Sequence, residues 1–164
     1  MDWTAALIPA ATAWHLGFEQ PMTIEISLLT EAELGAAQNL MRDLGYEIDA
    51  AELAKRFQAV RAYDDHAVFI ARIDGAVLGM VHIYQRAALE KPVEGYVQSF
   101  VVSAAKQRTG IGHALMQAAE DWAQARGLTS ISLHTSLHRE GALAFYTREG
   151  FEEISQGRML RKNL

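Results

Sequence analysis

The chain has 164 residues, half of them hydrophobic, and a formal net charge of −5. Its length suggests one domain, and its apolar fraction allows a sizeable core and argues against global disorder. An acidic chain lacks the basic face of a general nucleic-acid binder, so we expect no nucleic-acid partner. The absence of cysteine excludes disulfides, thiolate metal sites and a cysteine nucleophile.

No apolar run approaches the ~20 residues of a membrane helix, so we expect no membrane partner and a cytoplasmic location. The start of the chain faintly resembles a signal peptide, but Asp2 stands where a basic region belongs and Pro9 cuts the apolar segment short. A clean strand pattern opens only at Met22. We therefore divide the chain into an N-terminal appendage without a catalytic role, residues 1–21, and a functional domain, residues 22–164.

The first half of this domain predicts one strand, two helices and a β-hairpin, over Ile24–Leu29, Thr30–Gly45, Asp49–Tyr63 and Ala67–Gln85. Thr30 and Glu33 form a capping-box pattern at the start of the first helix. Asp74-Gly75 divides the hairpin and is a strong type I′ turn signal. Gly79, inside the second strand of the hairpin, indicates a bulge or a close backbone approach.

The second half predicts a strand, a helix, a strand, a helix and a terminal hairpin, over Glu94–Val102, Ile111–Arg126, Ser130–His134, Arg139–Glu149 and Phe151–Arg161. The terminal hairpin would consist of Phe151–Ser155 and Met159–Arg161 around a Gln156-Gly157 turn. With hairpins in the middle and a crossover helix beyond them, the element order indicates an α/β fold. We expect a mixed, mostly antiparallel sheet with helices on both faces.

A turn with two glycines, Gln107–Gly112, lies between the strand Glu94–Val102 and the helix that follows. Free backbone N–H groups at the positive end of a helix dipole bind phosphate without a cationic side chain. The turn is not a P-loop, because His113 and Ala114 replace the required Lys and Ser/Thr. It does not fit the dinucleotide fingerprint either, because Leu115 occupies the third glycine position.

The turn matches a third pattern, Q/R-x-x-G-x-G/A, and the later segment Ala142–Phe151 matches A-x-x-F-Y…G-F through Phe145-Tyr146 and Gly150-Phe151. Together with the element order, these two motifs resemble the GCN5-related N-acetyltransferase (GNAT) superfamily, from Ile24 to the C-terminus. The resemblance implies an enzyme of the GNAT (acyl-CoA N-acyltransferase) fold. Such an enzyme moves acetyl from acetyl-CoA to a primary amine of a small molecule or a protein, by direct attack in a ternary complex.

The resemblance also implies roles for particular residues. The turn would bind the pyrophosphate of coenzyme A, through Gln107, Arg108, Thr109, Gly110, Ile111, Gly112 and His113. The main chain of Phe100, Val101 and Val102 would pair with the pantetheine arm, and the Val102 N–H would polarise the thioester carbonyl. Tyr146 would protonate the departing thiolate as general acid, since a phenol keeps its proton at neutral pH. No metal is implied.

The general base is less clear, because Gln98 stands where many relatives carry a glutamate, and an amide cannot accept a proton at neutral pH. Glu94, His82, His134 and a chain of water molecules remain open as substitutes, and Glu94 is the candidate we carry forward. Arg139 stands where relatives often have an asparagine that contacts the cofactor, so that contact is also open.

The acceptor amine is indicated only by acidic residues in the regions that shape the acceptor pocket in this family, namely Glu47, Asp49, Glu52, Asp64, Asp65, Glu90 and Glu94. They would suit a cationic amine such as a polyamine, an aminoglycoside or a lysine side chain, and a solvated acidic surface explains them equally well. Two other functions stay open, a non-catalytic acyl-CoA sensor and an acyltransferase for a longer acyl group. A homodimer is also open, since dimers are common among relatives.

Overall fold

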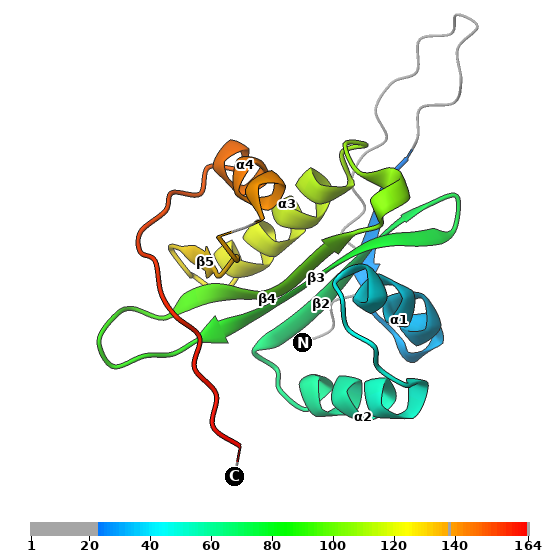
Figure 1. Ribbon diagram of the computed structural model, residues 1–164, viewed down its shortest axis with the longest axis horizontal. Helices are drawn as coiled ribbons and strands as arrows, with labels where there is room; N and C mark the ends of the chain where they lie inside the picture. The colour runs from blue at the N-terminus through cyan, green and yellow to red at the C-terminus, as the bar shows by residue number, and fades with distance from the viewer. Residues whose placement is uncertain (1–22, 138, 164) are drawn as a thin grey trace, which may run out of the picture.

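The computed structural model describes residues 23–137 and 139–163, so the expected appendage, residues 1–21, lies outside the described residues (Figure 1). Within them one sheet has the strand order β1-β2-β3-β4-β5, and the strands are β1 Glu25–Leu28, β2 His66–Ile73, β3 Ala76–Arg86, β4 Glu94–Val102 and β5 Ile131–Leu133. The first four strands pair antiparallel, and β4 pairs parallel with β5. The sheet is therefore mixed and mostly antiparallel, as predicted.

Helices cover both faces of the sheet (Figure 1). They are α1 Leu34–Asp43 and α2 Ala50–Arg61 on one face, and α3 Ile111–Gln124 and α4 Glu140–Arg148 on the other. On the α1 side, Ala37 and Leu40 pack on Ile70, Met80 and Val101. The larger cluster lies under α3, which buries Ile111, Leu115, Ala119, Trp122 and Ala123 against the sheet. None of the helices in the described part of the chain is long and apolar enough to span a membrane.

Local signals in the sequence explain where most elements begin and end. Asp49 accepts a hydrogen bond from the Glu52 N–H at 2.9 Å and caps α2. Before α1, the chain makes a short 3₁₀ turn, Glu31–Glu33, where the Glu33 carboxylate accepts from the Thr30 N–H at 2.7 Å. Asp74 and Gly75 both have positive φ, 50° and 78°, as a type I′ hairpin turn requires.

Gly79 lies at a bulge and at a close approach, so both readings of this glycine are confirmed. The β2–β3 register shifts between Ala71, which faces Gly79, and Arg72, which faces Val77. A Cβ atom on Gly79 would lie 2.8 Å from both Ile111 Cγ2 and Leu115 Cδ1. The missing side chain therefore lets α3 lie directly on β3.

A second irregularity lies in β4, where Gln98 has no partner in β3 because Val97 faces Ile83 and Ser99 faces His82. The extra residue shifts the alternation of the strand. Val97 and Phe100 therefore both pack with the α3 cluster, whereas Val101 packs on the α1 side.

The predicted terminal hairpin is wrong, because residues 151–163 contain no strand (Figure 1). The alternating pattern is present in the sequence, but a strand also needs a partner edge, and β5 is only three residues long. Ile154, Met159 and Leu160 are accordingly 85%, 81% and 89% exposed. The described sheet has five strands where the sequence predicts seven.

We expect Gly79→Ala to lower the free energy of unfolding by about 1–3 kcal/mol, because the new methyl group would overlap side chains that are themselves fully buried. Urea denaturation measures this change. Gly35→Ala in α1 is the control, since nothing lies within 4 Å of its added Cβ and alanine favours a helix. Equal denaturation midpoints for wild type and Gly79→Ala would contradict the close approach.

Candidate active site

The turn between β4 and α3 has an unusual backbone. It begins with a 3₁₀ turn, Ala104–Lys106, and both Arg108 and Gly110 then adopt left-handed conformations, with φ of 63° and 88°. The Thr109 hydroxyl donates to the Lys106 carbonyl at 2.7 Å and closes the turn. Such a sequence of left-handed residues turns successive N–H groups toward one point.

The start of α3 leaves donors free for a ligand. Its N-cap is Gly110, which has no side chain to bond the first turn, and the Ala114 N–H is bonded to the Gly110 carbonyl at 3.0 Å. The N–H groups of Ile111, Gly112 and His113 precede that bond and have no intrahelical acceptor. They lie at the positive end of a helix of 14 residues, which is suited to an anion such as a phosphate.

One edge of β4 is open beside this turn. The pairing with β5 extends only over Gly95, Tyr96 and Val97, so the strand is unpaired on that side beyond the bulge. The Ser103 N–H donates to the Leu78 carbonyl of β3. In an antiparallel pair the backbone groups of successive residues point alternately toward and away from the partner strand, so those of Phe100 and Val102 face the open edge. Those of Val101, which faces Met80, turn toward β3.

An aromatic cluster connects the open edge to α4. The Phe100 ring stacks on Phe145 with centroids 5.3 Å apart, and Tyr146 lies edge-on to Phe100, Phe145 and Phe151 at 6.1, 5.4 and 5.8 Å. Gly112 completes this packing, because a Cβ there would lie 3.0 Å from the Phe145 ring. The glycine turn, the open edge and Tyr146 therefore lie together.

Tyr146 is held as a neutral phenol. Burial raises the pKa of its hydroxyl above the ordinary value, and the charge of Arg139 acts in the opposite direction to a smaller extent. The side chain lines a groove of about 1230 Å³ beside β5 and α4, which also contains Ser132 and His134. A protonated hydroxyl in such a place is a suitable proton donor.

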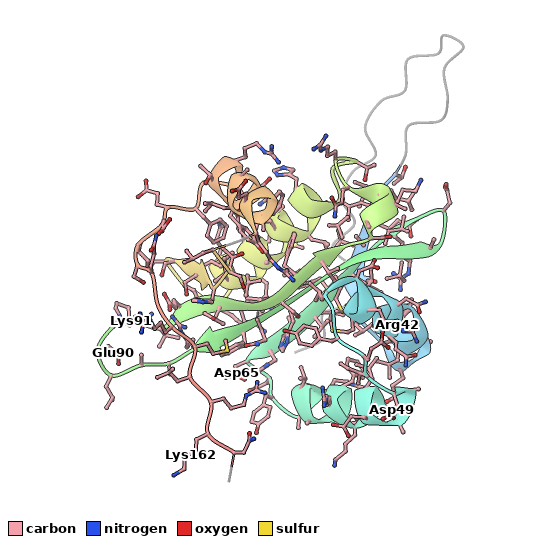
Figure 2. All side chains as sticks on the ribbon, viewed as in Figure 1. Arg42, Asp49, Asp65, Glu90, Lys91 and Lys162 are labelled. Atoms are coloured by element: carbon pink, nitrogen blue, oxygen red, sulfur yellow. The ribbon has the colours of Figure 1, made fainter. Side chains whose placement is uncertain are left out.

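Glu94 does not have the environment of a base. Its side chain is 10% exposed and accepts from Lys91 Nζ at 2.6 Å and from Arg86 Nε at 3.0 Å. Burial alone would raise the pKa of this carboxyl, but bonds from Lys91, Arg86 and Ser132 outweigh it and hold the pKa below its usual range. Glu94 also lies at the far end of β4 from the turn, and Figure 2 shows Lys91 in the adjoining β3–β4 loop. This environment favours a structural role for the Glu94 carboxylate.

The other residues considered for the general base lie in different parts of the molecule. Gln98 is exposed at the bulge, and His134 is exposed just after β5. His82 is partly buried on the α1–α2 face, where its Nε2 lies 2.9 Å from Nδ1 of His66. Burial first, and then the charge of His66, lower the pKa of His82 to about 4, so His82 is neutral at pH 7. Sequence reasoning did not find His66.

The acidic residues near the first two helices are largely engaged within the protein. Glu47 pairs with Arg42 at 3.6 Å, and Glu52 pairs with Arg56 at 2.8 Å. Asp49 is occupied as the α2 cap. Figure 2 shows Arg42 and Asp49 on the side of the molecule formed by α1 and α2. The surface around α1 and α2 therefore carries less unpaired negative charge than the sequence suggests, which weakens the argument for a polycationic acceptor.

The chain matches known proteins over most of its length. The model of the acetyltransferase (GNAT) family matches residues 26–151. Over 94 residues the chain is 33% identical to the aminoglycoside N(6′)-acetyltransferase type 1 of Klebsiella aerogenes, a region that is 56% of this chain and 62% of that relative. The chain thus spans less than two thirds of that relative's length. It is also 26% identical over 120 residues to the uncharacterized N-acetyltransferase YhdJ of Bacillus subtilis, covering 73% of this chain and 84% of YhdJ.

Solved structures share the fold at low sequence identity. The aminoglycoside N-acetyltransferase AAC(6′)-Iy in complex with CoA superposes with a TM-score of 0.79 at 17% identity, over 90% of this chain and 99% of that one. An acetyltransferase of Trypanosoma brucei superposes with a TM-score of 0.70 at 21% identity, over 87% and 100% of the two chains. These likenesses establish the same architecture.

We expect Glu94→Gln to lower the free energy of unfolding at pH 7 by about 1–3 kcal/mol, because Arg86 and Lys91 would lose their shared carboxylate. Since the folded pKa of Glu94 is lowered, its contribution is complete above the unfolded pKa and is lost as pH falls through the folded pKa. The difference between wild type and variant should therefore shrink below about pH 4.5. Urea denaturation at several pH values measures it.

Glu52→Gln is the matched control, because its ion pair with Arg56 is exposed and should contribute less than about 1 kcal/mol. A wild-type advantage over Glu94→Gln that stays constant from pH 7 to pH 4 would show that this carboxylate does not titrate as described.

Proposed function

This chain belongs to the GNAT family of acetyltransferases, and we propose that it transfers an acetyl group from acetyl-CoA to the primary amine of a small molecule, by direct attack within a ternary complex. The observation that carries the proposal is the grouping of three features at one place. These are the anion-binding start of α3, the open edge of β4 and the neutral phenol of Tyr146.

The cofactor fits the residues that are present. The Ile111, Gly112 and His113 N–H groups bind the pyrophosphate, and the left-handed backbone at Arg108 and Gly110 brings further N–H groups toward it. Gln107, Arg108 and Thr109 complete the turn, and the exposed Arg108 adds positive charge. His113 also reaches Glu149 at the end of α4, with its Nδ1 2.8 Å from Oε2.

The open edge of β4 orients the reacting end. Phe100 and Val102 present backbone groups to an extended pantetheine arm, in the manner of an added strand. Bound acetyl-CoA supplies a thioester whose carbonyl carbon is open to attack by an amine. The Val102 N–H donates to the thioester oxygen and stabilises the charge that develops there, and Tyr146 donates its proton to the departing sulfur.

The proposed acceptor class rests on the relatives and on the charge of the site. The relatives with described substrates are named as aminoglycoside acetyltransferases, which supports a small-molecule amine. The paired carboxylates around α1 and α2 argue against an acceptor that needs several free negative charges. From these relatives we therefore take a small molecule with a primary amine, and we do not extend the proposal to the polycationic aminoglycosides themselves.

We expect Tyr146→Phe to lower kcat for acetyl transfer by about 10²–10⁴-fold, because the thiolate loses its proton donor. The affinity for CoA should stay close to that of wild type, because the ring contacts with Phe100, Phe145 and Phe151 remain. Release of free CoA with a panel of primary amines measures the rate, and calorimetry measures the affinity. An unchanged kcat would remove Tyr146 from this role. Tight CoA binding by a wild type that acetylates no amine would favour the acyl-CoA sensor instead.

We expect Gly110→Ala to weaken CoA binding by about tenfold or more, equivalent to about 1.4 kcal/mol, because an alanine resists the left-handed conformation that directs the turn. Gly127→Ala is the matched control. Gly127 follows the other end of α3 with a φ of 71° and nothing within 4 Å of an added Cβ. Calorimetric titration with CoA compares the two. An equal loss of affinity in both variants would point to general destabilisation and against a phosphate site at Gly110.

A further inference from the structure

A pair of histidines lies on the α1–α2 face of the sheet, opposite the face that carries α3. His66 begins β2 and His82 lies in the middle of β3, with His66 Nδ1 2.9 Å from His82 Nε2. The His66 ring stacks on Tyr84 with centroids 4.8 Å apart and an interplanar angle of 10°, and the Tyr63 ring lies 5.4 Å from the His66 ring. His66 is therefore held in place by a ring of β3 and a ring of the loop between α2 and β2.

The bulge near Gly79 brings the two histidines to one face. Beyond the bulge, His66 faces Tyr84 and Val68 faces His82. At the hairpin turn, Ile73 faces Ala76. If this register continued without the bulge, His66 would face Ile83, and the two imidazoles would point to opposite faces of the sheet. The pair thus depends on the bulge next to Gly79, the residue at which α3 approaches the sheet.

A carboxylate lies behind the pair and sets its polarity. Asp65 Oδ1 is 3.7 Å from His66 Nε2, and among the described residues it is the buried side-chain oxygen without a hydrogen-bond partner. Figure 2 shows Asp65 where the chain passes from α2 into β2. A carboxylate there favours a proton on His66 Nε2, so that neutral His66 accepts at Nδ1. His82 must then donate through Nε2, which leaves its Nδ1 as a free acceptor.

His82 also lines a cavity of about 100 Å³ between the sheet, α1 and α2, which contains Ser99 of β4 and is otherwise mainly apolar. Ser99 lies opposite His82 and next to the bulge at Gln98, where the open edge of β4 begins. The histidine is therefore one strand spacing, about 5 Å, from the strand along which the thioester is proposed to lie. An amine in this cavity would lie beside both the His82 side chain and Ser99 of β4.

We propose that His82 removes a proton from the acceptor amine, and that His66 and Asp65 position His82 and carry the proton away. This inference rests on the proposed function, and it supplies the base that Gln98 cannot provide. His82 is the catalytic residue, and His66 and Asp65 are positioning residues.

The acceptor loses its first proton through the two imidazoles. The ammonium group gives one proton to His82 Nδ1, His82 passes its Nε2 proton to His66 Nδ1, and His66 passes its Nε2 proton toward Asp65 and solvent. The neutral amine then attacks the thioester carbon, and the C–S bond breaks as Tyr146 protonates the sulfur. The second proton of the attacking nitrogen returns to Tyr146. Exchange with solvent then returns the proton of each imidazole from Nδ1 to Nε2, and one proton is released for each acetyl group transferred.

Few other charged groups face this site. Arg56 of α2 lines the cavity, and its guanidinium is paired with Glu52 at 2.8 Å. His66 and Asp65 face His82 from β2 and from the residue before it, and Tyr84 follows on β3. The low pKa of His82 keeps its imidazole neutral at pH 7, as a proton acceptor requires.

The test compares two small apolar amines, n-butylamine and 2,2,2-trifluoroethylamine, with full-length protein and acetyl-CoA. At pH 7.5 butylamine is almost entirely protonated, whereas the fluorines make the second amine largely neutral. We expect His82→Gln to lower kcat with butylamine by about 10²–10⁴-fold and to lower it far less with trifluoroethylamine. Added imidazole should restore part of the butylamine rate.

His66→Gln and Asp65→Asn should lower kcat less and leave KM unchanged. The control is Gln117→Ala on the exposed side of α3, which lines neither the cavity nor the groove beside Tyr146 and should behave as wild type.

Equal losses with both amines, or no loss, would overturn the base assignment. Long-range ¹H–¹⁵N NMR shows which ring nitrogens of the histidines carry a proton. It is measured on the wild-type protein, so it needs neither an acceptor nor a variant that folds. A bare Nδ1 on His82 and a protonated Nε2 on His66 support the relay, and a proton on His82 Nδ1 overturns it.

Failure of the proposed function gives a different result, because wild type would then release no CoA with either amine. Failure of the relay alone leaves wild type active and Tyr146→Phe impaired, with His82→Gln unaffected.

Discussion

The parallel pairing of β4 with β5 stops after Val97, where β4 bulges at Gln98, and the candidate site depends on this interruption. A continuous pair would satisfy the backbone of Phe100 and Val102 within the sheet and leave nothing for a ligand. The bulge also changes which face each side chain occupies, so that Phe100 joins the aromatic cluster of Tyr146 while Ser99 opens on the opposite cavity. One extra residue thus places Phe100 on the face that carries Tyr146 and Ser99 on the face that carries His82.

The turn that we propose to bind an anion leads directly into the core. Ile111 is the first residue of α3 and is 1% exposed, and Leu115, one turn later, is fully buried against β3. Gly79 permits this contact, and the bulge beside it also brings His66 and His82 to one face. The approach of α3 and the pairing of the histidines therefore depend on the same short stretch of β3, the first on the missing side chain of Gly79 and the second on the bulge beside it.

The sequence predicted the elements whose signals are local. The Asp49 cap, the Asp74-Gly75 turn and the strand Glu94–Val102 all agree with the structure, since each depends on neighbouring residues or on an uninterrupted pattern. The terminal hairpin failed because alternation over residues 151–161 cannot show whether a partner edge exists. His66 was missed for a related reason. Its pairing with His82 follows only if the bulge suggested by Gly79 is carried through the register of the hairpin.

By itself the sequence determined the GNAT resemblance and the α/β fold, and it predicted an anion site at the glycine turn, because the residues of each motif lie within a few positions of one another and of a strand or helix end. The tertiary structure alone decided which carboxylates and histidines are available. Glu94 is held by Arg86 and Lys91, and His82 is joined to His66 and Asp65, because residues far apart in the chain meet only when the strands align. Their protonation is set by burial and by the charges that folding brings near them.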